Sequence, residues 1–137
     1  SLALEAKKLD MAKGAGGATQ DQRNMVAVSK DKAMQLTQQA DQLIALIKKH
    51  GTDESGAPVI GTPGVARDMD LLSHGMAKDM ASMTDPKTGV RDAEMEAMAK
   101  TIFKRGYGQF DADAIAGLEA LKKYAAKRYM TDVEATR

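Results

Sequence analysis

The chain has 137 residues, of which 43% are hydrophobic and 4% aromatic, and its 20 basic and 19 acidic side chains leave a net charge of +1. This balance gives no global attraction to nucleic acid or to an anionic membrane, and no apolar run approaches the roughly 18 residues of a membrane span. The absence of cysteine excludes disulfides, thiolate nucleophiles and Cys-ligated zinc.

Residues 1–12 are predicted to form a short helix with Leu2, Ala6 and Leu9 on one face. The following segment, 13–18, carries three glycines in four positions, which disfavour a helix and predict a hinge. A phosphate-binding loop is a poor alternative because no strand precedes it, and because Thr19 stands where the dinucleotide fingerprint needs its third glycine.

The longest uninterrupted helical pattern covers residues 19–50, with Thr19 and Gln22 spaced as a capping box. Apolar and small residues recur in alternating steps of three and four, which is the heptad spacing of a helix that packs against another helix. Basic residues and Gly51 predict its C-terminal end. Members of this seam include Val26, Ala33, Leu36, Ala40, Leu43 and Ile47.

A loop is predicted at 51–62, and Thr62 followed by Pro63 marks the start of a helix over 63–83. This helix carries a stripe formed mainly by methionine, which adapts to irregular contacts but also serves as ordinary core filler. Gly75 within it indicates close packing against a neighbour. The stripe consists of Val65, Met69, Leu72, Met76, Met80 and Met83.

The segment from Thr84 to Gly89 is predicted to be a turn. If Gly89 took the sixth position of a calcium loop, Pro86 would occupy the third position, where a carboxylate is needed. A plain connection between helices is therefore the better interpretation. Two further helices follow at 91–105 and 111–130, the second capped by Asp111 or Asp113, before a tail at 131–137.

These elements predict an all-α fold in which a helical arm, residues 1–50, accompanies a compact three-helix unit over 63–130. The exposed apolar stripes that this arrangement leaves predict a homo-oligomer. The residues expected at its interface are Val26, Ala33, Leu36, Ala40, Leu43, Ile47, Met69, Leu72, Met76 and Met80.

Chemical candidates are few. His50 and His74 are the only histidines, and apart from His74 with Asp70 neither has a partner at the spacing typical of a helical metal pair. Neither a metal nor another cofactor is expected. The C-terminal half carries basic residues interleaved with tyrosines, which suits phosphate backbones and stacked bases. The alternative is a solvated face with helix-end cations. The nucleic-acid candidates are Lys104, Arg105, Lys122, Lys123, Lys127 and Arg128.

Two stretches resemble helical segments of tailed-bacteriophage virion proteins. One is the arm rich in Ala, Gln and Lys, from Leu4 to Leu9 and on to Asp41–Ile44; the other runs from Thr62–Val65 through Gly89–Met95 to Leu118–Leu121. The resemblance is to the internal class that leaves the capsid with the genome. It implies a non-enzymatic virion component, assembled in the host cytoplasm as a homo-oligomer with other virion proteins and in non-specific contact with DNA.

Two other interpretations belong to different classes. A cytosolic helical adaptor would bind a partner helix in a methionine-rich groove. An enzyme would need a nucleophile and a base, or a small-molecule site, and the sequence offers no such set.

Overall fold

The computed structural model describes residues 20–53 and 64–130. Within these ranges the fold is all-α and no strand is formed, which confirms the predicted class. The predicted helix at 1–12, the hinge at 13–18, most of the loop at 51–62 and the tail at 131–137 lie outside the described residues. The elements are α1 (Gln20–His50), α2 (Val65–Ser82), α3 (Ala93–Ile102), α4 (Ala114–Ala125) and the π-helical turn η2 (Ala126–Met130).

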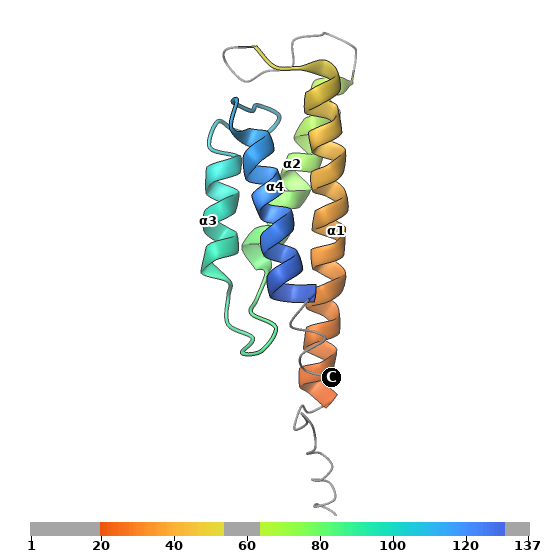
Figure 1. Ribbon diagram of the computed structural model, residues 1–137, viewed down its shortest axis with the longest axis vertical. Coiled ribbons are helices and arrows are strands. Elements are labelled where there is room, and N and C mark those ends of the chain that lie inside the picture. Colours follow the sequence, from red (N-terminus) through yellow and green to blue (C-terminus); the bar gives the residue numbers. More distant parts are fainter. Residues whose placement is uncertain (1–19, 54–63, 131–137) are drawn as a thin grey trace, which may run out of the picture.

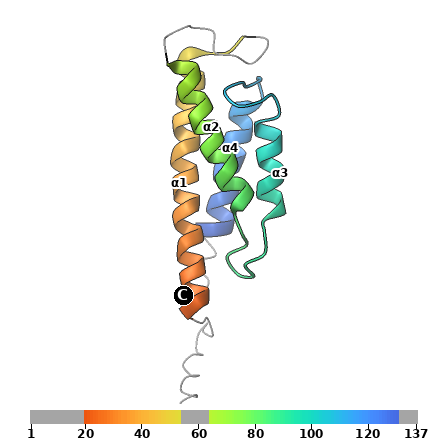
Figure 2. The same cartoon turned by 180° about the vertical axis from the view of Figure 1, so that it is seen from behind.

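The four α-helices form an up-down-up-down bundle, seen from two sides in Figures 1 and 2. Each helix packs against two others: α1 contacts α2 and α4, and α3 contacts the same two helices from the other side. The turn η2 continues α4 and also packs against α1. Antiparallel packing of sequential helices is the usual arrangement of such a bundle.

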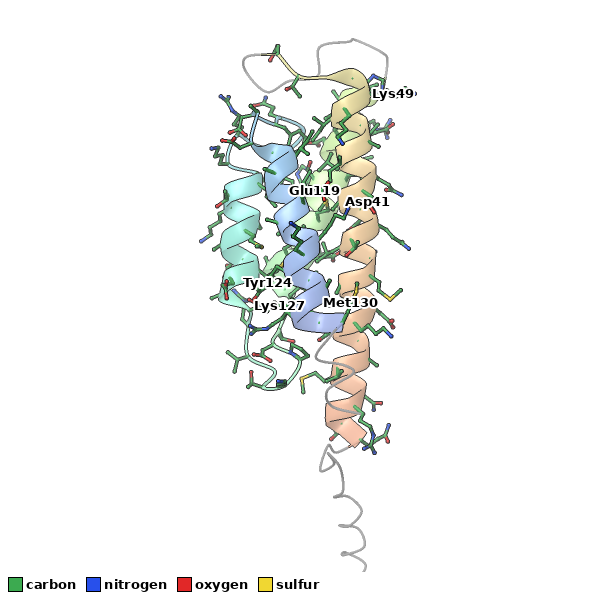
Figure 3. The ribbon with its side chains drawn as sticks, viewed as in Figure 1. Asp41, Lys49, Glu119, Tyr124, Lys127 and Met130 are labelled. Carbon is green, nitrogen blue, oxygen red and sulfur yellow. The ribbon has the colours of Figure 1, made fainter. Side chains whose placement is uncertain are left out.

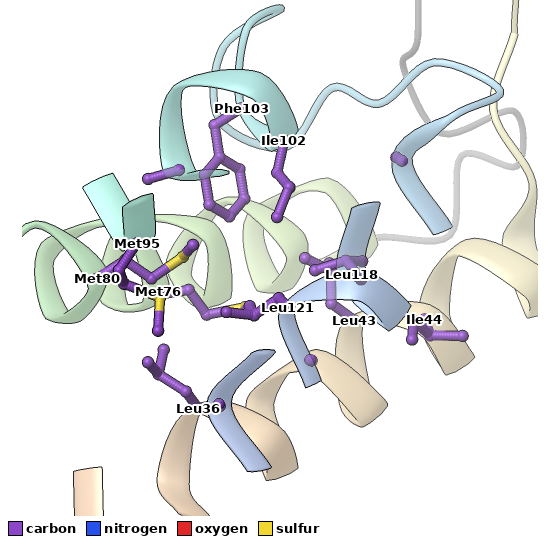
Figure 4. Packing of buried hydrophobic residues seen from close by; sticks show 14 of the residues in the cluster. Leu36, Leu43, Ile44, Met76, Met80, Met95, Ile102, Phe103, Leu118 and Leu121 are labelled. Carbon is purple, nitrogen blue, oxygen red and sulfur yellow. The ribbon is translucent and has the colours of Figure 1, made fainter. Parts of the chain in front are cut away.

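The core corrects the expected division into an arm and a separate three-helix unit. Helix α1 shares one continuous cluster of buried side chains with α2, α3 and α4. Figure 4 shows Leu36 and Leu43 of α1 in the same group of buried side chains as Leu118 and Leu121 of α4. The heptad seam of α1 is therefore filled within the chain, and α1 is the fourth member of the bundle.

The helix ends follow local backbone chemistry. Gly51 has a φ of 69° and donates its N–H to the carbonyl of Ile47 at 2.7 Å, which closes α1 where the sequence predicts. Helix α2 begins at Val65 rather than residue 63, after Gly64 at a φ of 93°. Helix α3 ends at Ile102, three residues before the predicted end, because the chain turns so that Phe103 enters the core.

The connection between α2 and α3 is a closed turn. Thr84 and Arg91 form an isolated antiparallel bridge, and Asp85 accepts the N–H of Gly89 on its carbonyl at 2.8 Å. The carboxylate of Asp85 also accepts the N–H of Lys87 at 2.8 Å. These bonds hold the turn as the plain helix connection that the sequence indicates.

Candidate functional site

The most unusual polar group of the described chain is the carboxylate of Asp92, which is only 3% exposed. Asp92 is the N-cap of α3, and its Oδ1 accepts the N–H of Met95 at 3.1 Å. A carboxylate at this position also interacts favourably with the positive end of the helix dipole. The same residue therefore starts α3 and places a negative charge inside the bundle.

Two tyrosines from the far end of the chain complete this site. The hydroxyl of Tyr124 donates to the Asp92 carboxylate, at 2.9 Å from both oxygens, and the hydroxyl of Tyr129 lies 2.6 Å from Oδ2. Burying a charge is costly unless such hydrogen bonds compensate for lost water. We call Asp92, Tyr124, Tyr129, Arg128 and Asp85 the Asp92 cluster.

The π-helical turn explains how both tyrosines reach one carboxylate. In a regular α-helix, residues five positions apart point about 140° away from each other around the axis. The wider η2 turn, which begins at Ala126, brings positions five apart onto one side. Tyr124 and Tyr129 can therefore face Asp92 together.

Arg128 ties the α2–α3 turn into the same cluster. Its Nη2 lies 2.6 Å from Oδ2 of Asp85, its Nε lies 3.8 Å from Oδ2 of Asp92, and its guanidinium stands 6.0 Å from the centre of the Tyr124 ring. A cation shared by two carboxylates balances part of their charge. The Asp92 cluster thus links three segments: the turn, the start of α3 and the end of α4.

The protonation states of Asp92 and the two tyrosines favour a structural role for the Asp92 cluster. Burial alone would raise the pKa of Asp92, but the hydrogen bonds from Tyr129, Met95 and Tyr124 and the charge of Arg128 outweigh it and lower that pKa. Burial and the bond to Asp92 raise the pKa of both tyrosines well above the usual value. At neutral pH the carboxylate is charged, the phenols are protonated, and the acceptor positions of Asp92 are already in use.

The six nucleic-acid candidates do not form one surface. Lys104 and Arg105 lie beyond the end of α3, where Asp111 binds Lys104 at 3.0 Å. The others belong to the opposite end of α4 or to η2, as the position of Lys127 in Figure 3 shows. Lys122 is bound to Asp41 of α1 at 2.6 Å, and Arg128 belongs to the Asp92 cluster.

Lys123 and Lys127 are exposed, and within residues 20–53 and 64–130 neither pairs with a carboxylate. They stand four positions apart near the end of the last helix. Of the six candidates, these two lysines are the most available to a phosphate. The tyrosines that the sequence placed beside them are turned inward to Asp92 instead.

The residues expected at an oligomer interface are mostly covered by the chain itself. All of them but Val26 and Leu72 belong to the single core; Val26 is buried outside it, and Leu72 is partly exposed. An interface between copies therefore has to use Leu72 or residues outside this set. The expected interface residues that are fully or largely buried are Val26, Ala33, Leu36, Ala40, Leu43, Ile47, Met69, Met76 and Met80.

An open groove runs along the outside of the bundle between α1 and α2. Its volume is about 640 Å³, and its apolar lining includes Leu46, Leu71 and Leu72. Lys49 and Asp68 stand on its two sides. We call this feature the α1–α2 groove; it lacks methionine among its lining residues.

His74 is also engaged locally. Its Nδ1 lies 2.9 Å from the carbonyl of Asp70 and 3.4 Å from the Asp70 carboxylate, and its ring stacks 3.7 Å from that of Tyr107. Among the described residues no group of three or more His, Asp or Glu is arranged to hold a metal ion. In the same part of the chain, no helix is both long and apolar enough to cross a membrane.

Comparison of the chain with protein families, with curated proteins and with solved structures gives no match.

Proposed function

We propose that the chain is a non-enzymatic structural component of a bacteriophage virion, of the internal class that accompanies genome delivery. In this role it acts as a homo-oligomer together with other virion proteins. The resemblance of its helical segments to such proteins supplies the viral context. The length of α1, which extends past the end of η2, is the structural observation that supports a role in assembly.

Helix α1 is longer than the bundle needs. Its 31 residues extend about 46 Å, whereas the 18 residues of α2 extend about 27 Å. Figures 1 and 2 both show α1 continuing past the end of η2. One side of this first part of α1 is covered by the chain, since Val26 is only 5% exposed, but its outer side presents Val28 and Met34 at 54% and 44% exposure. Exposed apolar surface of this kind is suited to contacts with neighbouring subunits.

The side chains that could take part in catalysis already make hydrogen bonds within the fold. Asp92 accepts hydrogen bonds from two tyrosines and a backbone amide, and His74 is bound to Asp70 and stacked on Tyr107. A general base needs a free acceptor near the reacting group. This supports a role in packing rather than in catalysis.

Contact with DNA in this proposal is non-specific and passes through Lys123 and Lys127. Two lysines contribute little binding on their own, but a ring of subunits would repeat them many times. Such binding weakens with salt in proportion to the phosphates neutralised. The adaptor alternative gains no support from the methionines, because Met69, Met76 and Met80 are covered by the chain itself.

The test uses particles of the phage that encodes the chain. We expect its peptides to be found by mass spectrometry in gradient-purified virions, to resist protease while particles are intact, and to leave the particles when ejection is triggered. A major capsid protein serves as the control that stays behind. Absence of the chain from purified virions, or its digestion on intact particles, would contradict the proposal.

A further inference from the structure

The α1–α2 groove exposes apolar surface at the outer edge of the bundle core. Leu71 lines the groove and is 60% exposed, and Leu46 and Leu72 beside it pack against the core and are partly exposed. A single exposed leucine is common, but here its neighbours in the open groove are also apolar. The groove therefore has the character of an association surface.

The outer face of α1 beside the groove is depleted of charge. Between Lys32 and Lys48 the helix carries a single charged residue, Asp41, in a chain that is 28% charged. Asp41 faces α4, where it binds Lys122 at 2.6 Å. The groove side instead presents Gln39, Gln42 and Ala45. Loss of charged residues is the compositional feature of the centre of protein interfaces.

The two charges on the groove lie at the same end of it and on opposite sides. Gly75 of α2 lies level with Gln39 of α1, since a Cβ at Gly75 would be 3.5 Å from the Gln39 amide. From that level, Lys49 is about 15 Å further along α1, and Asp68 is about 10 Å along the antiparallel α2 in the same direction. Within the described ranges neither Lys49 nor Asp68 has an ion-pair partner.

A two-fold axis parallel to the helices would bring these charges together. Such an axis places α1 of one copy on α2 of the other, so that each Lys49 meets the Asp68 of its partner. The contact is self-complementary, as a two-fold interface requires. An axis across the helices would instead place α1 on α1 and leave both charges unmatched.

We propose that the α1–α2 groove is the contact between two copies of this chain, related by a two-fold axis parallel to the helices. This inference rests on the proposed homo-oligomeric function and assigns it a surface. Leu71 fills the groove of the partner, and two Lys49–Asp68 pairs set the register. The opposite charges of Lys49 and Asp68 favour a second copy because the two-fold axis pairs both of them at once.

The first experiment removes the apolar contact. Sedimentation velocity over a range of concentrations compares the full chain with Leu71→Gln and with Val90→Gln. Val90 is a matched control because it is 65% exposed in the α2–α3 turn, away from the groove. We expect Leu71→Gln to weaken self-association at least tenfold, while Val90→Gln leaves it unchanged. Circular dichroism verifies that both variants fold.

The second experiment tests the symmetry of the charges. Lys49→Asp and Asp68→Lys each create like charges across the contact, and each alone is expected to weaken self-association about tenfold or more. The doubly exchanged chain should regain it. An equimolar mixture of the two single variants should also associate, because every contact between the two kinds of chain then joins a carboxylate to an ammonium group.

The outcomes separate this inference from the proposed function. If the chain associates but Leu71→Gln and both charge variants associate equally well, the groove is not the contact, and the homo-oligomer remains. The inference would also be overturned if the single charge variants associate more weakly and neither the doubly exchanged chain nor the mixture of the two single variants regains association. A wild-type chain that stays monomeric at the highest concentration overturns both the groove contact and the homo-oligomer, whereas membership of the virion is judged by the particle experiment.

Discussion

The hydroxyl of Tyr129 lies 2.6 Å from Oδ2 of Asp92, although 37 positions separate the two residues in the chain. Both side chains are buried. The bond joins the end of the last helix to the beginning of α3, and it depends on the π-helical turn that carries Tyr129. A widened turn is an unfavourable helix geometry, so the hydrogen bonds to Asp92 are a physical reason for its presence.

Replacing Tyr129 with Phe should lower the free energy of unfolding by about 1–3 kcal/mol. The substitution keeps the ring but removes a donor from a buried, charged acceptor, which makes the loss larger than for a neutral hydrogen bond. Urea denaturation followed by circular dichroism measures it. Tyr107→Phe is the matched control, because Tyr107 is 43% exposed and loss of its hydroxyl is expected to change stability little. Equal losses in the two variants would show that the hydrogen bond from Tyr129 to Asp92 adds nothing to the free energy of unfolding.

Acidification should remove the contribution of Asp92. Its pKa in the folded protein is lowered from the usual 3.8, so the unfolded chain binds the proton first as the pH falls. The stability that Asp92 provides is therefore complete above about pH 5 and is lost as the pH falls through the folded-state pKa. Unfolding free energies measured from pH 7 down to pH 2 follow this loss.

Asp92→Asn isolates that contribution from the other carboxylates. We expect the variant to be about 1–3 kcal/mol less stable at pH 7, because the charge that binds Arg128 and the tyrosines is gone. The difference from the wild-type chain should shrink as the pH falls. The pKa of Asp111 is also lowered, mainly by its bond to Lys104. Because Asp111 is present in both chains, its contribution cancels in the stability difference between them. A difference that stays constant over the whole pH range would argue against a charged Asp92.

Alkaline conditions should act through the tyrosines. The pKa of Tyr124 and of Tyr129 is raised in the folded protein by burial and by the bond to Asp92. Their contribution is therefore complete below the unfolded pKa of about 10 and declines as the pH rises above it. Tyr129→Phe should reduce the slope of stability against pH between 9 and 11. An unchanged slope would mean that Tyr129 ionises as easily in the folded chain as in the unfolded one.

The seam of α1 offers a stronger test of the fold. Leu43 is fully buried, so Leu43→Asp removes a large apolar side chain and places a carboxylate in the core. We expect a loss of more than about 4 kcal/mol, which is a large part of the stability of a small domain. Met34→Asp on the exposed side of the same helix is the control and should lose less than about 1 kcal/mol. Thermal unfolding of both variants gives the comparison.

The positions of the helices in this fold can be predicted from local sequence. Which helices pack against each other is harder to predict. The end of α1 follows from Gly51 and the start of α3 from Asp92, because caps act over a few residues. The seam through Leu36 and Leu43 is equally clear as a buried stripe. Its partner is not, because an apolar stripe has the same pattern whether it packs against its own chain or against a second copy. The structure shows that α2 and α4 of the same chain provide the partners.

The Asp92 cluster could not be predicted for a different reason. Tyr124 and Tyr129 are five positions apart, and on a regular helix this spacing places them on different sides. Nothing local indicates the π-helical turn, which forms where tertiary hydrogen bonds favour it. The basic residues were misleading in a similar way, since Lys122 and Arg128 are bound to carboxylates that are distant in sequence. Two tyrosines among so few aromatic residues were the available signal.

Two glycines in helix interiors should respond oppositely to the same substitution. Gly75→Ala adds a Cβ that would lie 3.5 Å from the Gln39 amide, an ordinary contact. The gain in helix propensity should therefore stabilise the chain by about 0.5–1 kcal/mol. At Gly117 the added Cβ would lie 3.1 Å from Cγ1 of Ile102, which is closer than the packing of α3 against α4 allows without movement.

Gly117→Ala should therefore not stabilise the chain, because the cost of displacing Ile102 offsets the gain in helix propensity. Each variant is its companion's control, since both replace a glycine within an α-helix by the same residue. Urea denaturation gives the two differences directly. If Gly117→Ala stabilises as much as Gly75→Ala, then α3 and α4 do not approach as closely at Gly117 as the structure indicates.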